Sequence, residues 1–208
     1  MRSRNRADDQ AADGRSFIEQ ARRAQIVEAA IQTLAEVGYG QASLAQIAKR
    51  AGISPSLISY HFADKDALMG QTLGDITDAW DVHVRRELAS CTTAGEQLRR
   101  YIEASLGHMA ARPAHFAALI EIAFGARTKD GQLLYRAADE EPELRLLQDV
   151  LERGQQSGEF RALDSRHVAL AIRGAINEFF GGMHLPGRRA DAYAADLADL
   201  FTRVVARL

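Results

Sequence analysis

The amino-acid sequence predicts an all-α protein, with a small N-terminal helical domain and a larger C-terminal one. Apolar residues recur at helical spacing along most of the chain, and no segment alternates as a β-strand would. The 208 residues include only four prolines. The composition is 47% hydrophobic and 26% charged, which is typical of a globular protein with a sizeable core.

Charge and cysteine content exclude several classes of protein. The 26 basic and 28 acidic residues give a net charge of −2, so any nucleic-acid-binding surface must be local. The single cysteine, Cys91, excludes an internal disulfide framework and agrees with a reducing cytoplasm. We find no apolar segment of a signal peptide near the N-terminus and no run of 18 apolar residues. We therefore expect a cytoplasmic protein without a membrane span.

The first element that we expect is a helix that begins near Phe17. Residues 1–16 carry arginines and aspartates without periodicity, which predicts a disordered arm. Such an arm is either a solvated tail or a segment that contacts a DNA minor groove or phosphates. After it, Val27, Ile31 and Leu34 share one helical stripe, and Gly38 and Gly40 end the helix.

Two short helices follow, in a pattern that is typical of a helix-turn-helix. Ser43 and Gln46 form a capping box that starts the second helix, and Gly52 breaks it. Ser54 and Pro55 start a third helix that ends near Phe62. The small Ala48 suits the tight crossing of the two helices, and Ile47, Ile53 and Ile58 can fill the space between them. The second helix of such a unit enters the major groove of DNA.

A helical wheel of the third helix predicts which side chains face outward. At about 100° per residue, Ile58 and Phe62 point inward, while Ser56 and Tyr60 point out. Leu57 and Ser59 flank the outward pair, which gives a face suited to phosphates, base edges and thymine methyl groups. No acidic residue occurs from Tyr39 to Ala63, and Lys49 and Arg50 add two positive charges. A carboxylate in this stretch would repel DNA phosphates.

Helices fill the rest of the chain. Asp64 caps a long helix that runs towards Ala89, and Lys65 stands in its first turn, where a bound phosphate would offset an unfavourable dipole interaction. A solvated lysine is the alternative. We expect further helices over residues 94–111, 113–125, 133–138, 142–157, 165–181 and 191–208.

Residues 22–73 resemble the DNA-binding domain of the TetR family of bacterial repressors. The resemblance rests on the run from Arg23 to Ala30, on Ala42-Ser43-Leu44, Ile47-Ala48, Ala51-Gly52-Ile53-Ser54 and Tyr60-His61-Phe62, and on Lys65-Asp66-Ala67-Leu68. Gly158-Glu159-Phe160 is also typical of the family. Many members carry tyrosine where this chain has Ser59, and the run from Leu57 to Phe62 is closer to the BetI-like branch.

The resemblance implies a ligand-responsive repressor that binds a palindromic operator as a homodimer and is released by a small-molecule effector. It implies a DNA-binding domain at 17–68 and a ligand-binding and dimerisation domain at 69–208. Phosphate contacts are expected from Ser43, Ser54, Tyr60, His61 and Lys65, base contacts from Pro55, Ser56, Leu57 and Ser59, and a further DNA contact from Lys49.

Two apolar helices near the C-terminus predict a dimer interface. Helices after Asp164 and Asp191 each carry an apolar stripe, so two of them from each chain could form a four-helix contact. The expected interface residues are Ala171, Gly174, Ala175, Glu178, Phe179, Leu197, Phe201 and Val204. The alternative is that both stripes face the core of their own chain.

The middle helices carry candidate effector contacts. Aromatic side chains, histidines and isolated acids there could orient a polar or cationic ligand in an apolar cavity. The candidates are Trp80, His83, Tyr101, His108, Met109, Phe116, Ile120, Glu121, Phe124, Asn177 and Glu178. The alternative is a set of core aromatics with exposed acids.

We expect no cofactor, no metal site and no enzymatic activity, because no catalytic or metal-ligand motif occurs. A second function stays open: a helical carrier or enzyme whose first three helices serve only for packing.

Overall fold

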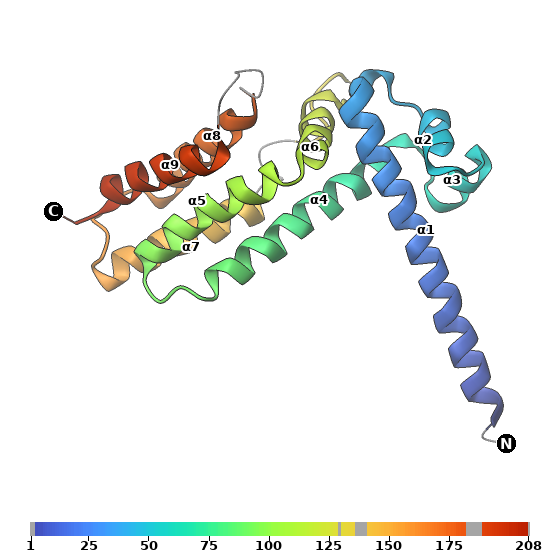
Figure 1. Cartoon of the computed structure of the whole chain (residues 1–208), viewed down its shortest axis with the longest axis horizontal. Coiled ribbons are helices and arrows are strands. Elements are labelled where there is room, and N and C mark those ends of the chain that lie inside the picture. The colour runs from blue at the N-terminus through green and yellow to red at the C-terminus, as the bar shows by residue number, and fades with distance from the viewer. Residues whose placement is uncertain (1–2, 129, 136–140, 182–188, 208) are drawn as a thin grey trace. The chain divides into compact units, whose positions relative to one another are not determined.

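A computed structural model describes residues 3–128, 130–135, 141–181 and 189–207. Within these ranges the named elements are all helices, as the sequence predicts, and β-structure is limited to isolated bridges (Figure 1). The helices are α1 (Ser3–Gln41), α2 (Leu44–Ala51), α3 (Pro55–His61), α4 (Lys65–Leu88), α5 (Ala94–Ala110), α6 (Pro113–Gly125), α7 (Glu141–Ser157), α8 (Ser165–Gly181) and α9 (Ala190–Val205). In the part of the chain that is described, no helix is both long and apolar enough to cross a membrane.

The first helix differs from its expected form at both ends. It begins at Ser3, inside the segment that the sequence analysis assigned to an arm. Alanine, arginine and glutamine in that segment have high helix propensity, which does not require an apolar stripe. Near the other end, Gly38 interrupts the helix with φ 75° and ψ 167°, and one more turn follows it to Gln41.

The chain divides into two compact units. The first unit contains Met1–Asp75 and Ala117–Gln132, and the second contains Ile76–Phe116 and Leu133–Leu208. Helices α4 and α6 therefore each contribute residues to both units. The domain boundary expected after residue 68 falls inside α4, which continues as one helix through that point. Periodicity cannot show where a continuous helix passes from one unit to the other.

The core of the first unit lies between α1, α2, α3 and the start of α4. Its fully buried side chains include Ile26, Leu34, Ile47, Ile58, Leu68 and Met69. The predicted stripe of α1 is confirmed, because Val27, Ile31 and Leu34 are at most 5% exposed.

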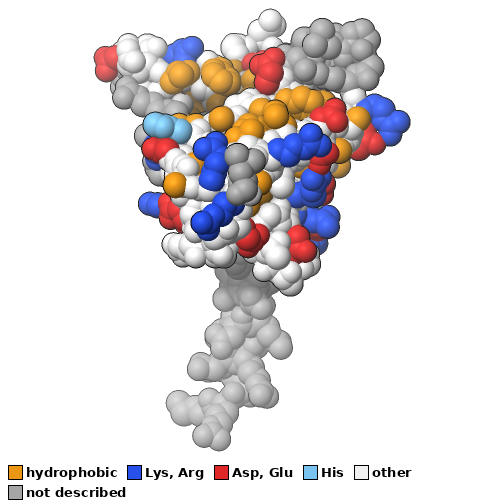
Figure 2. Space-filling model, turned by 90° about the vertical axis from the view of Figure 1, so that its left-hand side faces the viewer, with side chains coloured by type: hydrophobic (Ala, Val, Ile, Leu, Met, Phe, Trp, Pro, Cys, Tyr) orange, Lys and Arg blue, Asp and Glu red, His pale blue; other side chains and the backbone are white. Residues whose placement is uncertain are grey.

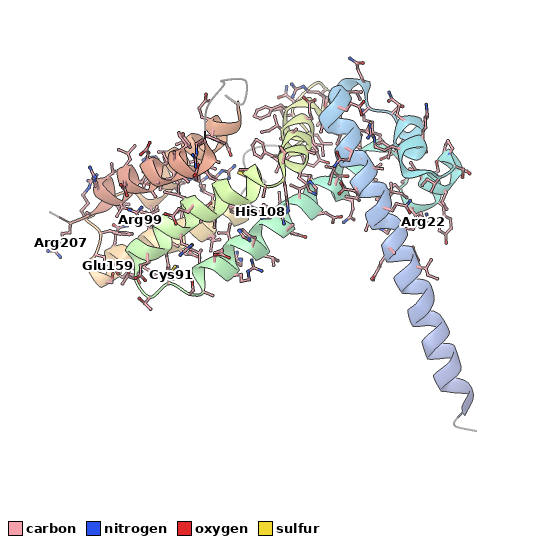
Figure 3. The ribbon with its side chains drawn as sticks, viewed as in Figure 1. Arg22, Cys91, Arg99, His108, Glu159 and Arg207 are labelled. Carbon is pink, nitrogen blue, oxygen red and sulfur yellow. The ribbon has the colours of Figure 1, made fainter. Side chains whose placement is uncertain are left out.

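In the second unit, α5 packs against α7, α8 and α9. The sequence Gly158-Glu159-Phe160 supports this packing. Both carboxylate oxygens of Glu159, which is labelled in Figure 3, accept backbone N–H groups at the start of α5: Oε1 from Ala94 at 3.1 Å and Oε2 from Gly95 at 3.0 Å. These bonds lower the pKa of Glu159. The ring of Phe160 lies against Gly154, where a Cβ atom would overlap it.

Most of the other helix boundaries agree with the expected ones to within a few residues. Asp64 and Asp164 act as caps, since each carboxylate accepts a backbone N–H three residues later. The helix expected over residues 133–138 is wrong for residues 133–135, which form a bridge and bends after a turn at Gly131. Six residues are too few to form a stable helix without tertiary support. Residues 136–138 lie outside the described ranges.

Candidate nucleic-acid interface

The turn between α2 and α3 is built from the caps that the sequence predicts. Ser43 Oγ accepts the Gln46 N–H at 3.3 Å, and Gln46 Oε1 accepts the Ser43 N–H at 2.9 Å, which completes the capping box. Gly52 ends α2 in the left-handed region, with φ 67° and ψ 32°. Ser54 Oγ then accepts the Leu57 N–H at 3.3 Å and starts α3. These bonds fix the direction of α3 relative to α2.

The crossing of α2 and α3 is tight and apolar. Ala48 is 1% exposed, and Ile47 and Ile58 are fully buried. Phe62 is 3% exposed, and Ile53 is half-buried. The residues expected to hold the two helices together therefore do so.

Two side chains of α1 hold the carbonyl ends of the short helices. Arg23 Nη1 donates to His61 O at 2.6 Å, and its guanidinium lies 4.4 Å from the centre of the Phe62 ring. Gln25 Nε2 donates to Ala51 O at 2.7 Å. Carbonyls in the last turn of a helix have no partner within it, so both bonds satisfy groups that would otherwise need water. Arg23 and Gln25 belong to the run quoted for the resemblance, but their partners could not be read from the sequence.

The outward face of α3 is as the helical wheel predicts. Tyr60 is 75% exposed, and Ser56 is exposed beside it. The exposed candidates are Ser43, Lys49, Ser54, Pro55, Ser56, Ser59 and Tyr60, whereas Leu57, His61 and Lys65 are half-buried. The hydroxyls lie close together, with Ser54 Oγ 2.9 Å from Ser56 Oγ. This face therefore offers hydroxyl groups and one aromatic ring to a DNA groove.

Two candidates at the edge of this face already make internal contacts. Lys65 Nζ donates to Tyr39 O at 2.7 Å and lies 4.2 Å from the centre of the Tyr39 ring. Desolvation in this position lowers the Lys65 pKa. An ammonium has three N–H donors, so Lys65 retains two for another acceptor. His61 Nδ1 is buried without a hydrogen-bond partner, and the His61 ring stands edge-on to Tyr60 with centroids 5.0 Å apart.

The positive charge of this face is smaller than the sequence window indicates. Arg50 forms an ion pair with Glu36, and its Nε donates to Thr33 Oγ1 at 3.1 Å. Glu36 lies on α1, outside the acid-free stretch, and the fold brings it to Arg50. Lys49, which is exposed, therefore carries the more available charge of the two.

Some of the candidate effector contacts come together in the second unit. The Trp80 ring, on α4, stands edge-on to the Tyr101 ring of α5, with centroids 5.9 Å apart. The His83 ring lies 4.8 Å from that of His108, which is labelled in Figure 3. Tyr101, His108 and Phe116 are buried, and Met109 is half-buried.

The other candidates lie elsewhere. Ile120, Glu121 and Phe124 belong to the first unit, where Glu121 Oε2 accepts the Tyr39 N–H at 2.7 Å and Phe124 is 63% exposed. Asn177 and Glu178 are exposed on α8. Helical spacing and isolated acids in apolar stretches suggest these residues, but neither signal shows the unit to which a helical segment belongs or whether its side chains are buried. Among the described residues, no group of three potential metal ligands occurs.

The expected interface residues divide between surface and core. Ala171, Gly174, Glu178 and Val204 are exposed, while Ala175 and Phe201 are half-buried. Phe179 and Leu197 are at most 7% exposed, and Phe179 stacks on Tyr193 with centroids 5.1 Å apart. Two leucines of these helices are also exposed: Leu170, at 47%, and Leu200, at 55%, which belongs to the apolar stripe of the last helix. Figure 2, which views the molecule from the left-hand side of Figure 1, shows hydrophobic side chains gathered in its upper part, with charged side chains below them.

Comparison with known proteins covers most of the chain. Residues 26–72 match the model of the bacterial regulatory proteins of the tetR family, and residues 91–205 match a tetracyclin repressor-like C-terminal domain. A transcriptional regulator named BetI from Pseudomonas fluorescens is 30% identical over 188 residues, which are 85% of this chain and 87% of that protein. An Escherichia coli BetI is 38% identical over 78 residues, 38% of this chain and 40% of that protein.

Solved structures show the same fold. A TetR family regulator from Marinobacter aquaeolei superimposes with a TM-score of 0.74 at 19% identity, over 93% of this chain and all of that one. The regulator FadR from Bacillus subtilis, solved with stearoyl-CoA, has a TM-score of 0.75 at 23% identity, over 86% of this chain and 97% of that one.

Proposed function

Since the chain belongs to the TetR family of bacterial transcriptional regulators, we propose that it is a repressor that binds a palindromic operator as a homodimer and is released by a small-molecule effector. The observation that carries this proposal is the outward face of α3. Its exposed serines and Tyr60 stand on a rigid, capped helix whose inward residues are fully used in packing. Side chains that are exposed and free of packing are available to bases and phosphates.

The proposed contacts follow from exposure and chemistry. Pro55, Ser56, Leu57 and Ser59 would approach bases, and Ser43, Lys49, Ser54, Tyr60, His61 and Lys65 would contact phosphates. The capped start of α3 would aim its first turn into the major groove, as in other helix-turn-helix units.

A homodimer would present two copies of α3 to the two halves of an operator. The exposed part of the α8–α9 face supports this proposal: Leu170, Ala171 and Gly174 on α8, and Leu200 and Val204 on α9. We propose these residues as the contact in place of Phe179 and Leu197, which their own unit buries.

An effector site in the second unit would complete the regulator. The curated relative is named as a transcriptional regulator, and FadR was solved with stearoyl-CoA, so helical domains of this fold hold ligands in at least that protein. We place the effector of this chain beside Trp80, His83, Tyr101 and His108, where aromatic rings of α4 and α5 meet.

The test is selection of a binding site from random DNA duplexes, followed by fluorescence anisotropy on the selected duplex. Wild type should bind it in the presence of random competitor, and Ser56→Ala and Tyr60→Ala should each bind at least tenfold more weakly. Ser90→Ala, an exposed serine in the turn after α4, is the matched control and should bind as wild type does. If no preferred duplex emerges, the protein is not a DNA-binding regulator of this kind and the carrier or enzyme alternative gains support. If wild type binds a selected duplex and both variants bind it unchanged, α3 does not make the proposed contacts.

A further inference from the structure

Among the described residues of the second unit, two buried side-chain polar groups have no hydrogen-bond partner. They are Nε1 of Trp80, on α4, and Oγ of Ser105, on α5. Ser105 is only 1% exposed, so water does not reach its side chain. Native structures rarely contain a buried donor without a partner, because the donor loses its hydrogen bonds to water and gains none in the protein. Such groups are candidates for contact with a bound molecule.

Both groups lie beside the aromatic cluster of α4 and α5. Tyr101, Ser105 and His108 are four and three residues apart, which places them on one face of α5. The Trp80 ring contacts Tyr101, and the His83 ring contacts His108. The unpaired groups thus belong to one cluster that is otherwise aromatic and apolar.

His108 belongs to this cluster as a neutral ring. Burial and the nearby Arg112, His83 and His115 lower the pKa of His108 to about 4, so its ring is neutral at pH 7. Its Nδ1 lies 3.3 Å from Arg112 Nη1. A guanidinium can only donate, so Nδ1 accepts and the ring proton sits on Nε2.

The charge of the cluster does not favour a cation. Asp81, next to Trp80, pairs with Arg85 at 2.6 Å, and Glu103, two residues after Tyr101, pairs with Arg99 at 3.8 Å. Asp78, two residues before Trp80, is exposed to solvent. A quaternary ammonium group has no lone pair, so it would leave both donors unpaired even where the aromatic rings attract its charge, whereas an oxygen acceptor satisfies them.

We infer that the cluster around Trp80 and Ser105 binds an apolar molecule through a hydrogen-bond-accepting oxygen group, a carbonyl or a carboxylate, and that it excludes organic cations. The indole N–H of Trp80 and the hydroxyl of Ser105 donate to this oxygen group, while Tyr101 and the ring face of Trp80 contact the apolar part. The role of this molecule as an effector rests on the proposed function. Its binding to the cluster does not depend on that function. The inference replaces the polar or cationic ligand expected from the sequence with one specific class.

The test uses the full-length protein and its own fluorescence, because Trp80 is the only tryptophan. Three compounds with similar alkyl chains are titrated below their micelle concentrations: decanoate, 2-decanone and decyltrimethylammonium. Decanoate or 2-decanone should change the emission of Trp80 with saturation, and the ammonium compound should bind at least tenfold more weakly. The tighter of the first two identifies a carboxylate or a neutral carbonyl. Equal or tighter binding of the ammonium compound, or no binding of either oxygen compound, overturns the inference.

Variants assign the binding to the two donors. Ser105→Ala should lower the affinity for the oxygen compound about tenfold. In the free protein the same variant should raise the urea midpoint of unfolding, because it removes an unpaired buried hydroxyl. Trp80→Phe keeps a ring but removes the N–H, so calorimetry should show a similar loss. Ser90→Ala should change neither quantity. If Ser105→Ala and Trp80→Phe both retain wild-type affinity, these donors do not hold the ligand.

DNA release separates this inference from the proposed function. If the bound compound also releases the selected duplex, both stand. If the compound binds at Trp80 without changing the affinity for DNA, the binding site is supported but the compound is not an effector. If DNA binding depends on Tyr60 and neither oxygen compound binds, the inference fails while the regulator stands.

Discussion

The backbone N–H of Tyr39 donates to Oε2 of Glu121 at 2.7 Å, although 82 positions of sequence separate the two residues. Gly38 interrupts α1 with φ 75°, so the chain leaves its helical path just before Tyr39. The carboxylate of α6 satisfies the amide at this break, and the ring of Tyr39 lies against Gly125 of the same helix. Tyr39 in turn accepts a bond from Lys65 through its carbonyl oxygen. One acid therefore fixes the end of α1 next to the helix-turn-helix.

Removal of that acid should destabilise the protein. Glu121→Ala leaves the Tyr39 N–H without its partner in a half-buried site, at a cost of about 1–3 kcal/mol in the free energy of unfolding. Urea denaturation followed by circular dichroism measures it. Glu36→Ala is the control, because its pair with Arg50 is exposed and worth at most about 1 kcal/mol. Equal effects of the two variants would mean that the Tyr39–Glu121 hydrogen bond contributes no more to the free energy of unfolding than an exposed ion pair does.

Two glycines should respond to alanine for different reasons. At Gly154, a Cβ atom would overlap the ring of Phe160, so Gly154→Ala should destabilise although alanine is the better helix former. At Gly107, in the middle of α5, a Cβ atom would meet open space, so Gly107→Ala should stabilise by about 0.5–1 kcal/mol. Thermal unfolding of the two variants should shift in opposite directions, and a shift in the same direction would contradict the packing of Phe160 on α7.

Gly52 should be sensitive to backbone conformation alone. Its φ of 67° is unfavourable for alanine, while no atom lies within 4 Å of where a Cβ would stand. Gly52→Ala should therefore cost about 1–2 kcal/mol, and Gly52→Asn less, because asparagine tolerates the left-handed region. Urea midpoints that fall in the order glycine, asparagine, alanine would agree with this explanation. Equal losses for both variants would indicate a steric cause instead.

The free energy of unfolding should fall at acidic pH because His108 binds a proton more readily in the unfolded chain. Its pKa is about 4 in the folded protein against 6.5 for a free histidine, so the unfolded chain binds more protons between these values. Stability should begin to fall as the pH drops through 6.5 and should have lost about 3 kcal/mol from this residue near pH 4. The loss of stability of wild type from pH 7 to pH 5 should exceed that of His108→Gln, and parallel curves would show that His108 does not titrate this way.

Operator binding should depend on salt through a small number of lysines. If Lys49 and Lys65 of each protomer contact phosphates, four contacts per dimer give a slope of log K against log salt of about −4. Lys49→Gln should reduce the steepness by about two. Arg153→Gln, on α7 of the second unit, is the charge-matched control and should leave the slope unchanged. Anisotropy titrations at several salt concentrations measure it, and a flat response in wild type would count against these contacts.

The sequence by itself determined the local structure of the helix-turn-helix, from Ser43 to Phe62. Ser43, Gly52 and Ser54 act on backbone groups within a few residues, so their caps follow from short-range stereochemistry. The inward and outward faces of α3 follow in the same way, because one turn of helix fixes the direction of every side chain. This is why Ile58 is buried and Tyr60 exposed as predicted.

Only the tertiary structure decided which distant groups meet. Arg23 on the carbonyl end of α3, Glu36 beside Arg50 and Glu121 beneath Tyr39 all join residues from different helices. In the tertiary structure Glu121 belongs to the first unit, and Phe179 and Leu197 are buried in the second. Trp80 Nε1 and Ser105 Oγ are buried without a hydrogen-bond partner. Helical periodicity gives the face of each helix but not the neighbour of that face, since the neighbour depends on how helices far apart in sequence pack together.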